Sequence, residues 1–267
     1  MAESTNPGKL SLHFESLSVH AGLNRSENEV KDIPVHATSP TVDVFEKRMA
    51  ALEAGEAALA TAFALPLPLG NPPRFIPSGD LDSVKKSIDE NTKAVFVESI
   101  STNDLLIADI EALSTVAREN GVPLIVDNTN GAGGLFIRPI SHGASIVLHS
   151  TAPWLSISGS STGGVIIDSG TFSWAAHPDH FPQFSDPSPG FHGLRISEKF
   201  GNLALVRFAR IAVMRDAGPC LNPFEAAVLL AGLETLAVKM DRVAENAKGI
   251  CGVAGETGEG CRCEVSR

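Results

Sequence analysis

The side chain best placed to do chemistry is Asp127, which follows the apolar run 122–126 and precedes the turn 128–134. Such a run is typical of a buried strand, so the carboxylate would stand at the end of the strand, beside a glycine-rich turn. A buried carboxylate there can hold the protonated pyridine nitrogen of a cofactor and strengthen its ring as an electron sink. It can equally cap the next turn, and the residues themselves leave both interpretations open.

The histidines give weaker signals. His177 and His180 could suggest a metal-binding pair, but Pro178 between them breaks the helical spacing that such pairs use. We therefore interpret this segment as a surface loop. His149 ends an apolar run and is interpreted as a packed core residue rather than a base.

The cysteines do not form a zinc motif either. Cys261 and Cys263 have one residue between them, and no histidine follows, so we expect free thiols for these two and for Cys251. The chain has neither a serine-nucleophile elbow nor a P-loop motif. We therefore predict no metal site.

The elements around Asp127 alternate between helix and strand. Apolar runs predict strands, and amphipathic runs predict helices, at 80–89 (helix), 93–98 (strand), 107–120 (helix), 122–126 (strand), 146–148 (strand) and 163–168 (strand). This order predicts an α/β fold with a mostly parallel sheet covered on both faces. Because functional groups in such sheets lie where strands end, we expect Ser150 to lie close to Asp127.

The flanking segments have less regular patterns. A helix capped by Thr41 or Asp43 is predicted to run into the alanine-rich segment 50–62, and a single long helix is predicted over 222–248. The prolines of 66–73 exclude a helix or a central strand. Residues 171–200, which are polar, aromatic and rich in proline, indicate a long surface loop.

Several long segments, in the same order, resemble one enzyme family over most of residues 12–250. The longest are VPLIVDNTNGAGG at 122–134 and HGASIVLHSTAPW at 142–154, with further segments at 41–48, 161–170, 181–193 and 221–236. They are similar to the pyridoxal-phosphate enzymes of cysteine and methionine metabolism, of the trans-sulfuration type, and in particular to the O-acetylhomoserine sulfhydrylases. The resemblance implies an aspartate-aminotransferase-type fold, with a large doubly wound domain and a small C-terminal domain.

The resemblance also implies pyridoxal phosphate held as a Schiff base on a lysine that shuttles protons during catalysis. The family reads Ser-Ala-Thr-Lys-Trp at this loop, whereas this chain reads STAPW over 150–154. Pro153 thus occupies the lysine position. Proline has no amine, so no Schiff base can form there.

The same resemblance assigns cofactor-binding roles to three residues. Asp127 would hold the pyridine nitrogen, and Ser150 would contact the phosphate. The family's Glu-Ser-Ile-Gly-Asn-Pro segment is ESISTN at 98–103 here, so its ring-contacting asparagine is either shifted to Asn103 or replaced by Thr102.

Other parts of the family's site are missing. The chain has 13 Phe and no Tyr, so it lacks the tyrosine that stacks on the ring and the one that reaches a neighbouring subunit's phosphate. The proline-rich run after Ala62 replaces a phosphate-cradling turn. A true loss of this segment and mis-assigned exons would both leave such a proline-rich run in its place.

We therefore predict four parts. These are a shortened N-terminal arm at 1–40, an incomplete large domain at 41–220, a helix at 221–250 leading to a missing small domain, and a disordered tail at 251–267. Without the small domain, that helix would expose Leu229, Leu233 and Leu236 to water, and the isolated chain would associate.

The composition of the chain argues against some classes of binding partner. Hydrophobic residues make up 43% of the chain, and the formal net charge is −10, so a phosphate backbone would be repelled and nucleic acid is not expected. The N-terminal residues contain no long apolar run, which favours the cytoplasm and no membrane.

Two functions remain. The first is a sulfhydrylase-like enzyme, impaired as written, that acts on an amino-acid ester and a sulfur nucleophile. The second is a non-catalytic pseudoenzyme that forms a homo-oligomer or is a structural partner of an intact paralogue.

Overall fold

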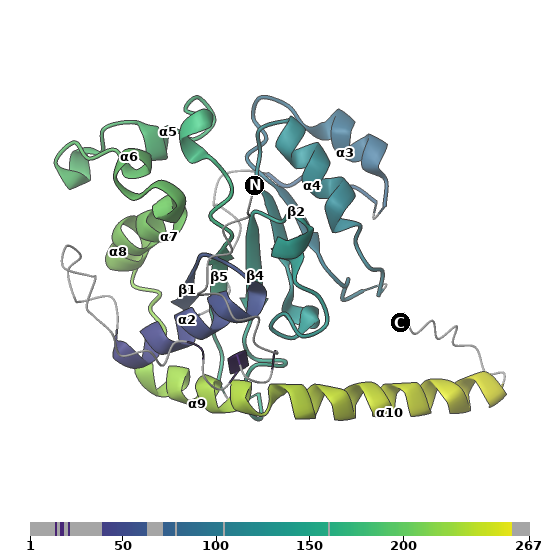
Figure 1. Cartoon of the computed structure of the whole chain (residues 1–267). Helices are drawn as coiled ribbons and strands as arrows, with labels where there is room; N and C mark the ends of the chain where they lie inside the picture. Colours follow the sequence, from purple (N-terminus) through teal and green to yellow (C-terminus); the bar gives the residue numbers. More distant parts are fainter. Residues whose placement is uncertain are drawn as a thin grey trace, which may run out of the picture.

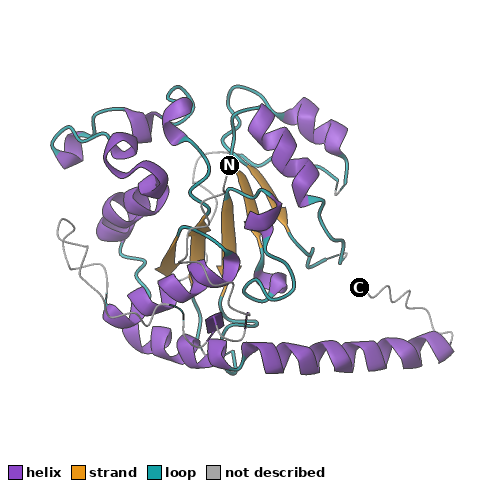
Figure 2. Cartoon of the chain, in the orientation of Figure 1, coloured by secondary structure: helices purple, strands orange, loops and turns teal. Residues whose placement is uncertain are grey.

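A mixed five-stranded sheet stands at the centre of the molecule, with helices on both of its faces (Figures 1 and 2). The computed structural model describes Phe14, Leu17, Ser18, Ala21 and residues 39–62, 72–77, 79–103, 105–159 and 161–257, with side chains up to residue 252. The strand order is β1-β5-β4-β3-β2. The strands are β1 (Ala57–Thr61), β2 (Val95–Glu98), β3 (Leu124–Asp127), β4 (Ile146–Ser150) and β5 (Gly164–Asp168).

Four of the five strands run in one direction. β2, β3 and β4 pair in parallel, whereas β5 pairs antiparallel with both β4 and β1. The predicted α/β class with a mostly parallel sheet is confirmed. We call the edge where β2, β3 and β4 end the carboxyl edge, and the opposite edge, where these strands begin, the amino edge.

The helices surround this sheet in sequence order. They are α2 (Pro40–Glu53), α3 (Leu81–Ser87), α4 (Ile110–Glu119), η2 (Thr129–Gly131), η3 (Pro139–His142), η4 (Trp174–Ala176), α5 (Pro182–Ser185), η5 (Pro189–Phe191), α6 (Ile196–Phe200), η6 (Gly201–Leu203), α7 (Ala204–Phe208), the π-helix η7 (Ala209–Met214), α8 (Arg215–Ala217), α9 (Pro223–Glu234) and α10 (Leu236–Thr257).

The start and the end of α2 differ from the sequence prediction. Ser39, not Thr41 or Asp43, is the N-cap, and its hydroxyl accepts a hydrogen bond from the amide of Val42 at 3.2 Å. The helix ends at Ala54, which has a left-handed φ of 61°. The alanine-rich segment beyond it is strand β1, because pairing with β5 outweighs the helical propensity of its alanines.

Alternate strand residues separate two apolar cores. Val147, Val165 and Ile167 face a core that includes side chains of α2, α4 and α9. Ile146 and its neighbours on the other face pack against aromatic residues of the segment 172–211. The prediction of a surface loop over 171–200 is therefore wrong for the aromatic side chains of this segment that are buried, which are those of Trp174, Phe181 and Phe184.

The predicted single helix over 222–248 is two helices, α9 and α10, which meet at Thr235. The expectation that its leucines are exposed is wrong. Leu229, Leu233 and Leu236 are each 0% exposed and lie in the core with α2. The alanine and leucine face of α9 packs on α2 without any covering domain.

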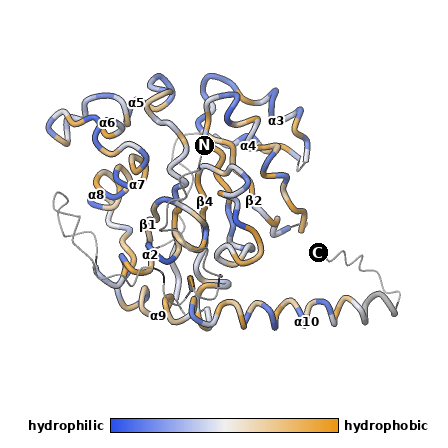
Figure 3. The backbone as a smooth tube through the Cα atoms, in the orientation of Figure 1, coloured by the Kyte–Doolittle hydropathy of each residue, from blue (hydrophilic) through white to orange (hydrophobic). Residues whose placement is uncertain are grey.

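The remainder of α10 projects away from the body (Figure 1). Met240 is buried, whereas Asp241 and almost all residues after it are exposed. Apolar and polar residues alternate along this part of the helix (Figure 3). None of the helices in the described residues combines the length and the apolar character that crossing a membrane requires.

The predicted tail boundary at residue 250 also differs from the structure. α10 continues through Thr257, and only 258–267 of the predicted tail lie outside the described residues. Cys251 is disulfide-bonded, so the expectation of a free thiol is wrong for this residue. Nearly all of the predicted arm, 1–40, lies outside the described residues.

Candidate functional site

The candidate site lies at the carboxyl edge. Glu98, Asp127 and Ser150 are the last residues of β2, β3 and β4, and Glu98 pairs with Asp127 in the ladder. As predicted, Asp127 stands at the C-terminal end of its strand. Parallel strands direct their final residues to one edge, which is where α/β proteins place their ligands.

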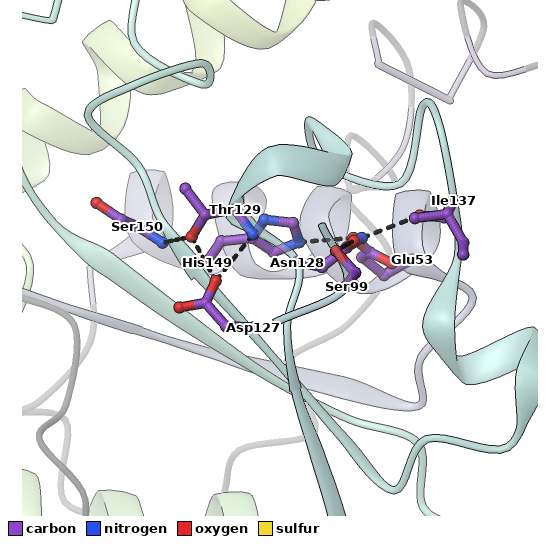
Figure 4. A network of polar contacts seen from close by, with 8 residues as sticks. All are labelled: Glu53, Ser99, Asp127, Asn128, Thr129, Ile137, His149 and Ser150. Carbon is purple, nitrogen blue, oxygen red and sulfur yellow. Dashed lines mark hydrogen bonds and ion pairs between the residues drawn. The ribbon is translucent and has the colours of Figure 1, made fainter. Parts of the chain in front are cut away.

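A short chain of hydrogen bonds joins Asp127 to Ser150. Asp127 Oδ1 accepts from the amide of Thr129 at 2.9 Å and from its hydroxyl at 2.6 Å. The Thr129 hydroxyl in turn accepts from the amide of Ser150 at 2.9 Å (Figure 4). No donor from the described residues meets the second carboxylate oxygen, Oδ2, of Asp127. Because Asp127 is only half-buried, this oxygen could accept a hydrogen bond from a cationic ligand atom.

The two alternatives for the ring-contacting residue behave differently. The hydroxyl of Thr102 lies 3.4 Å from the side-chain amide of Asn130, which also donates to the carbonyl of Ile100 at 3.0 Å. Asn130 follows Asp127 by three residues, so Thr102 is tied to the site. Asn103 is exposed, and its backbone amide is 3.4 Å from the hydroxyl of Ser101. Its predicted role stays a prediction.

The loop after Ser150 carries no amine. Pro153 is exposed, and none of the residues 150–159 is a lysine. The indole of Trp154 lies 3.4 Å from the side-chain oxygen of Asn130, which places the loop over the turn after Asp127. The site therefore fits the pyridine nitrogen of pyridoxal phosphate but offers no group in this loop for covalent attachment.

Sequence reasoning missed Lys239, which reaches this loop from α10. Its ammonium donates to the carbonyls of Trp154 and Ser156, the latter at 3.0 Å, and burial lowers the pKa of Lys239. Lys93, in contrast, donates to the carbonyl of His180 at 2.9 Å and precedes β2, so it lies toward the amino edge. Only the three-dimensional packing of α10 could reveal the contact of Lys239.

α9 also presses on the same loop. A Cβ at Gly232 would stand 2.1 Å from the carbonyl oxygen of Leu155, so only glycine permits this approach. Together with Lys239, this contact holds the backbone of the loop against the C-terminal helices.

A second group of missed residues lies behind the site and is fully buried. Glu53 Oε1 is 2.5 Å from His149 Nε2 and accepts from the side-chain amide of Asn128 at 2.7 Å. Asn128 Oδ1 accepts from the hydroxyl of Ser99 at 2.7 Å. His149 is thus a buried, paired residue, as expected. The available signal was the position of Asn128 and His149 directly beside Asp127 and Ser150.

Comparison with known protein families gives a match over residues 69–253, more than half of the chain, to the Cys/Met metabolism PLP-dependent enzymes. The chain belongs to this family. The prediction from the sequence segments is therefore confirmed, and the family's cofactor is pyridoxal phosphate.

Individual members of the Cys/Met metabolism family agree with this. The chain is 37% identical to the sulfhydrylase FUB7 of Fusarium oxysporum f. sp. lycopersici over 88% of this chain and 69% of the relative. It is 38% identical to the homocysteine synthase of Schizosaccharomyces pombe over 88% of this chain and 70% of the relative. The chain thus spans about two thirds of the length of these relatives.

A solved structure confirms the fold class. The structure of a putative O-acetylhomoserine (thiol)-lyase from Campylobacter jejuni superposes with a TM-score of 0.74 at 24% identity, over 90% of this chain and 75% of the other. That protein contains an N′-pyridoxyl-lysine-5′-monophosphate residue. Our chain thus has the fold of that structure, and the assignment of Pro153 to the lysine position stays a prediction from the sequence.

Proposed function

We propose that this chain is a sulfhydrylase-like protein that binds pyridoxal phosphate at the carboxyl edge without a covalent bond, and that it is impaired in the family's chemistry. Asp127 would hold the pyridine nitrogen through Oδ2, Ser150 would contact the phosphate, and Asn103 or Thr102 would contact the ring. One observation carries the proposal: Asp127 Oδ1 accepts two hydrogen bonds, whereas Oδ2 accepts none from the described residues, and the loop beside it has no amine side chain.

The chemistry divides between what this site keeps and what it lacks. Pyridoxal phosphate supplies an electron sink when it is bound. Asp127 would keep a proton on the ring nitrogen, which maintains that property. The family's proton-shuttling lysine is Pro153 here, so turnover of an amino-acid ester with a sulfur nucleophile would be strongly reduced.

The test compares two ligands. Pyridoxine 5′-phosphate has no aldehyde, so it reports non-covalent binding alone, and we expect it to bind the purified chain with an affinity that falls in Asp127→Asn. Pyridoxal phosphate followed by borohydride should leave no label on residues 150–159. A label concentrated on one lysine, such as Lys239, Lys93 or Lys199, would contradict non-covalent binding. Failure of pyridoxine 5′-phosphate to bind would contradict the site.

Restoring the amine gives a sharper prediction. We expect the double variant Ala152→Thr with Pro153→Lys to be labelled by borohydride at residue 153, because the lysine would stand in the loop that the family uses. Ile157→Lys places an amine at another exposed position of the same loop and serves as the matched control. Equal labelling of both would show that the loop does not face the bound cofactor. The transcript offers an independent check, since a Ser-Ala-Thr-Lys sequence there would assign the missing lysine to the gene model.

A non-catalytic role as a partner of an intact paralogue is the second candidate function. The projecting part of α10, with Ile250 70% exposed, favours it because this surface has no cover among the described residues. Co-expression with a complete family member, followed by size-exclusion chromatography, tests it. A complex that persists in Ile250→Glu would argue against α10 as the contact.

A further inference from the structure

Glu53 stands behind the carboxyl edge, in a cluster that takes no part in the proposed ligand contacts. The members of this cluster are almost entirely buried: Glu53, Ser99 and Asn128 are 0% exposed and His149 is 1% exposed. They come from the C-terminal turn of α2 and from the ends of three neighbouring strands (Figure 4).

One carboxylate oxygen joins two of these strands. Glu53 Oε1 is 2.5 Å from His149 Nε2 on β4 and 2.7 Å from Asn128 Nδ2, directly after β3. The oxygen of the same Asn128 amide accepts from Ser99, directly after β2, at 2.7 Å. A change at Glu53 would therefore alter the contacts at the ends of β2, β3 and β4 together.

The cluster residues alternate with the site residues along the chain. Asn128 follows Asp127, and His149 precedes Ser150, so neighbouring side chains point to opposite sides of the backbone. The contacts of Glu53 with Asn128 and His149 therefore hold in place the backbone from which Asp127 and Ser150 project. The distance between the two site residues is thus set by contacts that lie outside the site.

The glycine-rich turn after Asp127 is shaped around this cluster. A Cβ at Gly131 would stand 2.0 Å from Asn128 Oδ1, and one at Gly134 would stand 2.8 Å from the carbonyl oxygen of Leu52 and 3.2 Å from Glu53 Cδ. Gly134 also has a φ of 86°. These two positions therefore require glycine because Asn128 and Glu53 approach the backbone there, and not because a phosphate does.

The cluster is not the most stable way to fill this space. Glu53 Oε2 and His149 Nδ1 are buried and have no hydrogen-bond partner among the described residues. Buried ionisable groups with unmade hydrogen bonds cost free energy that well-packed apolar residues would not. An arrangement that gives up stability while fixing geometry indicates a positioning role.

We propose that Glu53 is a positioning residue, which acts through Asn128 and His149 to hold Asp127 and Ser150 at the spacing that the ligand requires. The proposal rests on the proposed function of the site for its ligand, pyridoxine or pyridoxal phosphate. Its geometric part, the fixed ends of β3 and β4, can be measured without any ligand.

The experiment compares Glu53→Gln with Glu46→Gln, which makes the same change on the same helix. Glu46 is also buried and accepts from the amide of Ala60 at 2.9 Å and from Arg210 at 2.6 Å. Ala60 belongs to β1, which β5 separates from β4, so these contacts do not involve the ends of β2, β3 and β4. Amide hydrogen exchange of Ser150, whose N–H donates to Thr129, reports the geometry. The dissociation constant of pyridoxine 5′-phosphate reports its consequence, measured well below each variant's melting temperature.

We expect Glu53→Gln to speed exchange at Ser150 and to weaken ligand binding, each by about tenfold, because an amide accepts these two hydrogen bonds less strongly than a carboxylate. Glu46→Gln should lower the melting temperature but change both readouts by less than about twofold. Equal effects of the two variants, or no effect of Glu53→Gln, would overturn the proposal.

Two further measurements keep the test decisive. If Glu53→Gln does not fold, His149→Gln removes only one arm of the cluster and should give a smaller change in the same direction; no change would count against the proposal. If the unmodified chain does not bind pyridoxine 5′-phosphate, the proposed function fails. The exchange rates of Ser150 then decide the positioning role by themselves.

Discussion

Two aspartates end buried strands in this chain, and they occupy opposite edges of the sheet. Asp127 ends the run LIVD of β3, and Asp168 ends the run VIID within β5. Asp127 is half-buried, and its Oδ2 accepts no hydrogen bond from the residues that the structure describes. Asp168 is 1% exposed; its Oδ1 accepts from the amide of Gly170 at 2.9 Å, and its Oδ2 has no partner in the part of the chain that the structure describes. The same local pattern therefore gives a candidate ligand contact in one place and a buried, uncompensated carboxylate in the other.

Strand direction is the cause of this difference. β5 runs against its neighbours, so Asp168 pairs with Ala57 and Ile146, the first residues of β1 and β4. It therefore lies at the amino edge, where no strand among β2, β3 and β4 ends. Burial, partly offset by the Gly170 hydrogen bond and assisted by nearby Glu56, raises the pKa of Asp168 to about 6. The following predictions test this comparison, from the largest expected effect to the smallest.

The largest effect should come from Asp168→Asn. The pKa of Asp168 is raised from 3.8 to about 6 in the folded chain, so its protonated form stabilises the fold fully below about pH 4, and this stabilisation is lost as pH rises through 6. Asparagine stays neutral and can still accept from Gly170. We expect Asp168→Asn to raise the free energy of unfolding by about 3 kcal/mol at pH 8 and to leave it nearly unchanged below about pH 4.

Urea unfolding of both proteins between pH 4 and pH 8 measures this difference. A gain that did not change with pH would show that folding does not raise the pKa of Asp168, and the contrast with Asp127 would then be one of position alone.

Asp127→Asn should affect ligand binding rather than stability. Removing the charge weakens the hydrogen bond to a protonated ring nitrogen by about 2 kcal/mol, which corresponds to about a thirtyfold weaker affinity for pyridoxine 5′-phosphate. Asp168→Asn, at the other edge, should change this affinity by less than about twofold. Calorimetric titration of the two variants measures both, and a comparable loss in Asp168→Asn would break the division between the edges.

The smallest effect should come from two lysines that hold backbone carbonyls at the two edges. Lys239→Met frees the carbonyls of Trp154 and Ser156 beside the candidate site, and Lys93→Met frees that of His180 near the amino edge. Each change should cost about 1 kcal/mol of stability. Only Lys239→Met should also weaken pyridoxine 5′-phosphate binding, by about threefold. An equal loss of affinity in both variants would show that it follows stability, not the loop.

The fold was largely predictable wherever the hydrophobic period was unambiguous. The strands that end at Glu98, Asp127 and Asp168 and the helix of 110–119 follow directly from apolar runs and amphipathic spacing. β1 could not be predicted in this way, because Ala57–Thr61 has the composition of a helix and becomes a strand only through its ladder with β5. The buried leucines of α9 could not be predicted either, since their cover is the face of α2, which is distant in sequence.

The site divides in the same way. The strand-end positions of Asp127 and Ser150 could be predicted from short segments, because they depend on local order along the chain. Their roles toward a cofactor, and that of Pro153, stay predictions. The contacts of Glu53 and Lys239 could not be predicted, because each acts on residues 75 or more positions away.

The sequence by itself determined the residue types: a strand-end carboxylate, a serine after the next strand, and a proline where the family has a lysine. The tertiary structure decided which strand-end carboxylate lies at the carboxyl edge, because the direction of a strand is set by its neighbours and not by its own residues. It also decided that one oxygen of Glu53 joins two strand ends. A hydrogen bond between distant segments exists only once the chain has closed the loop between them, and no local pattern records that closure.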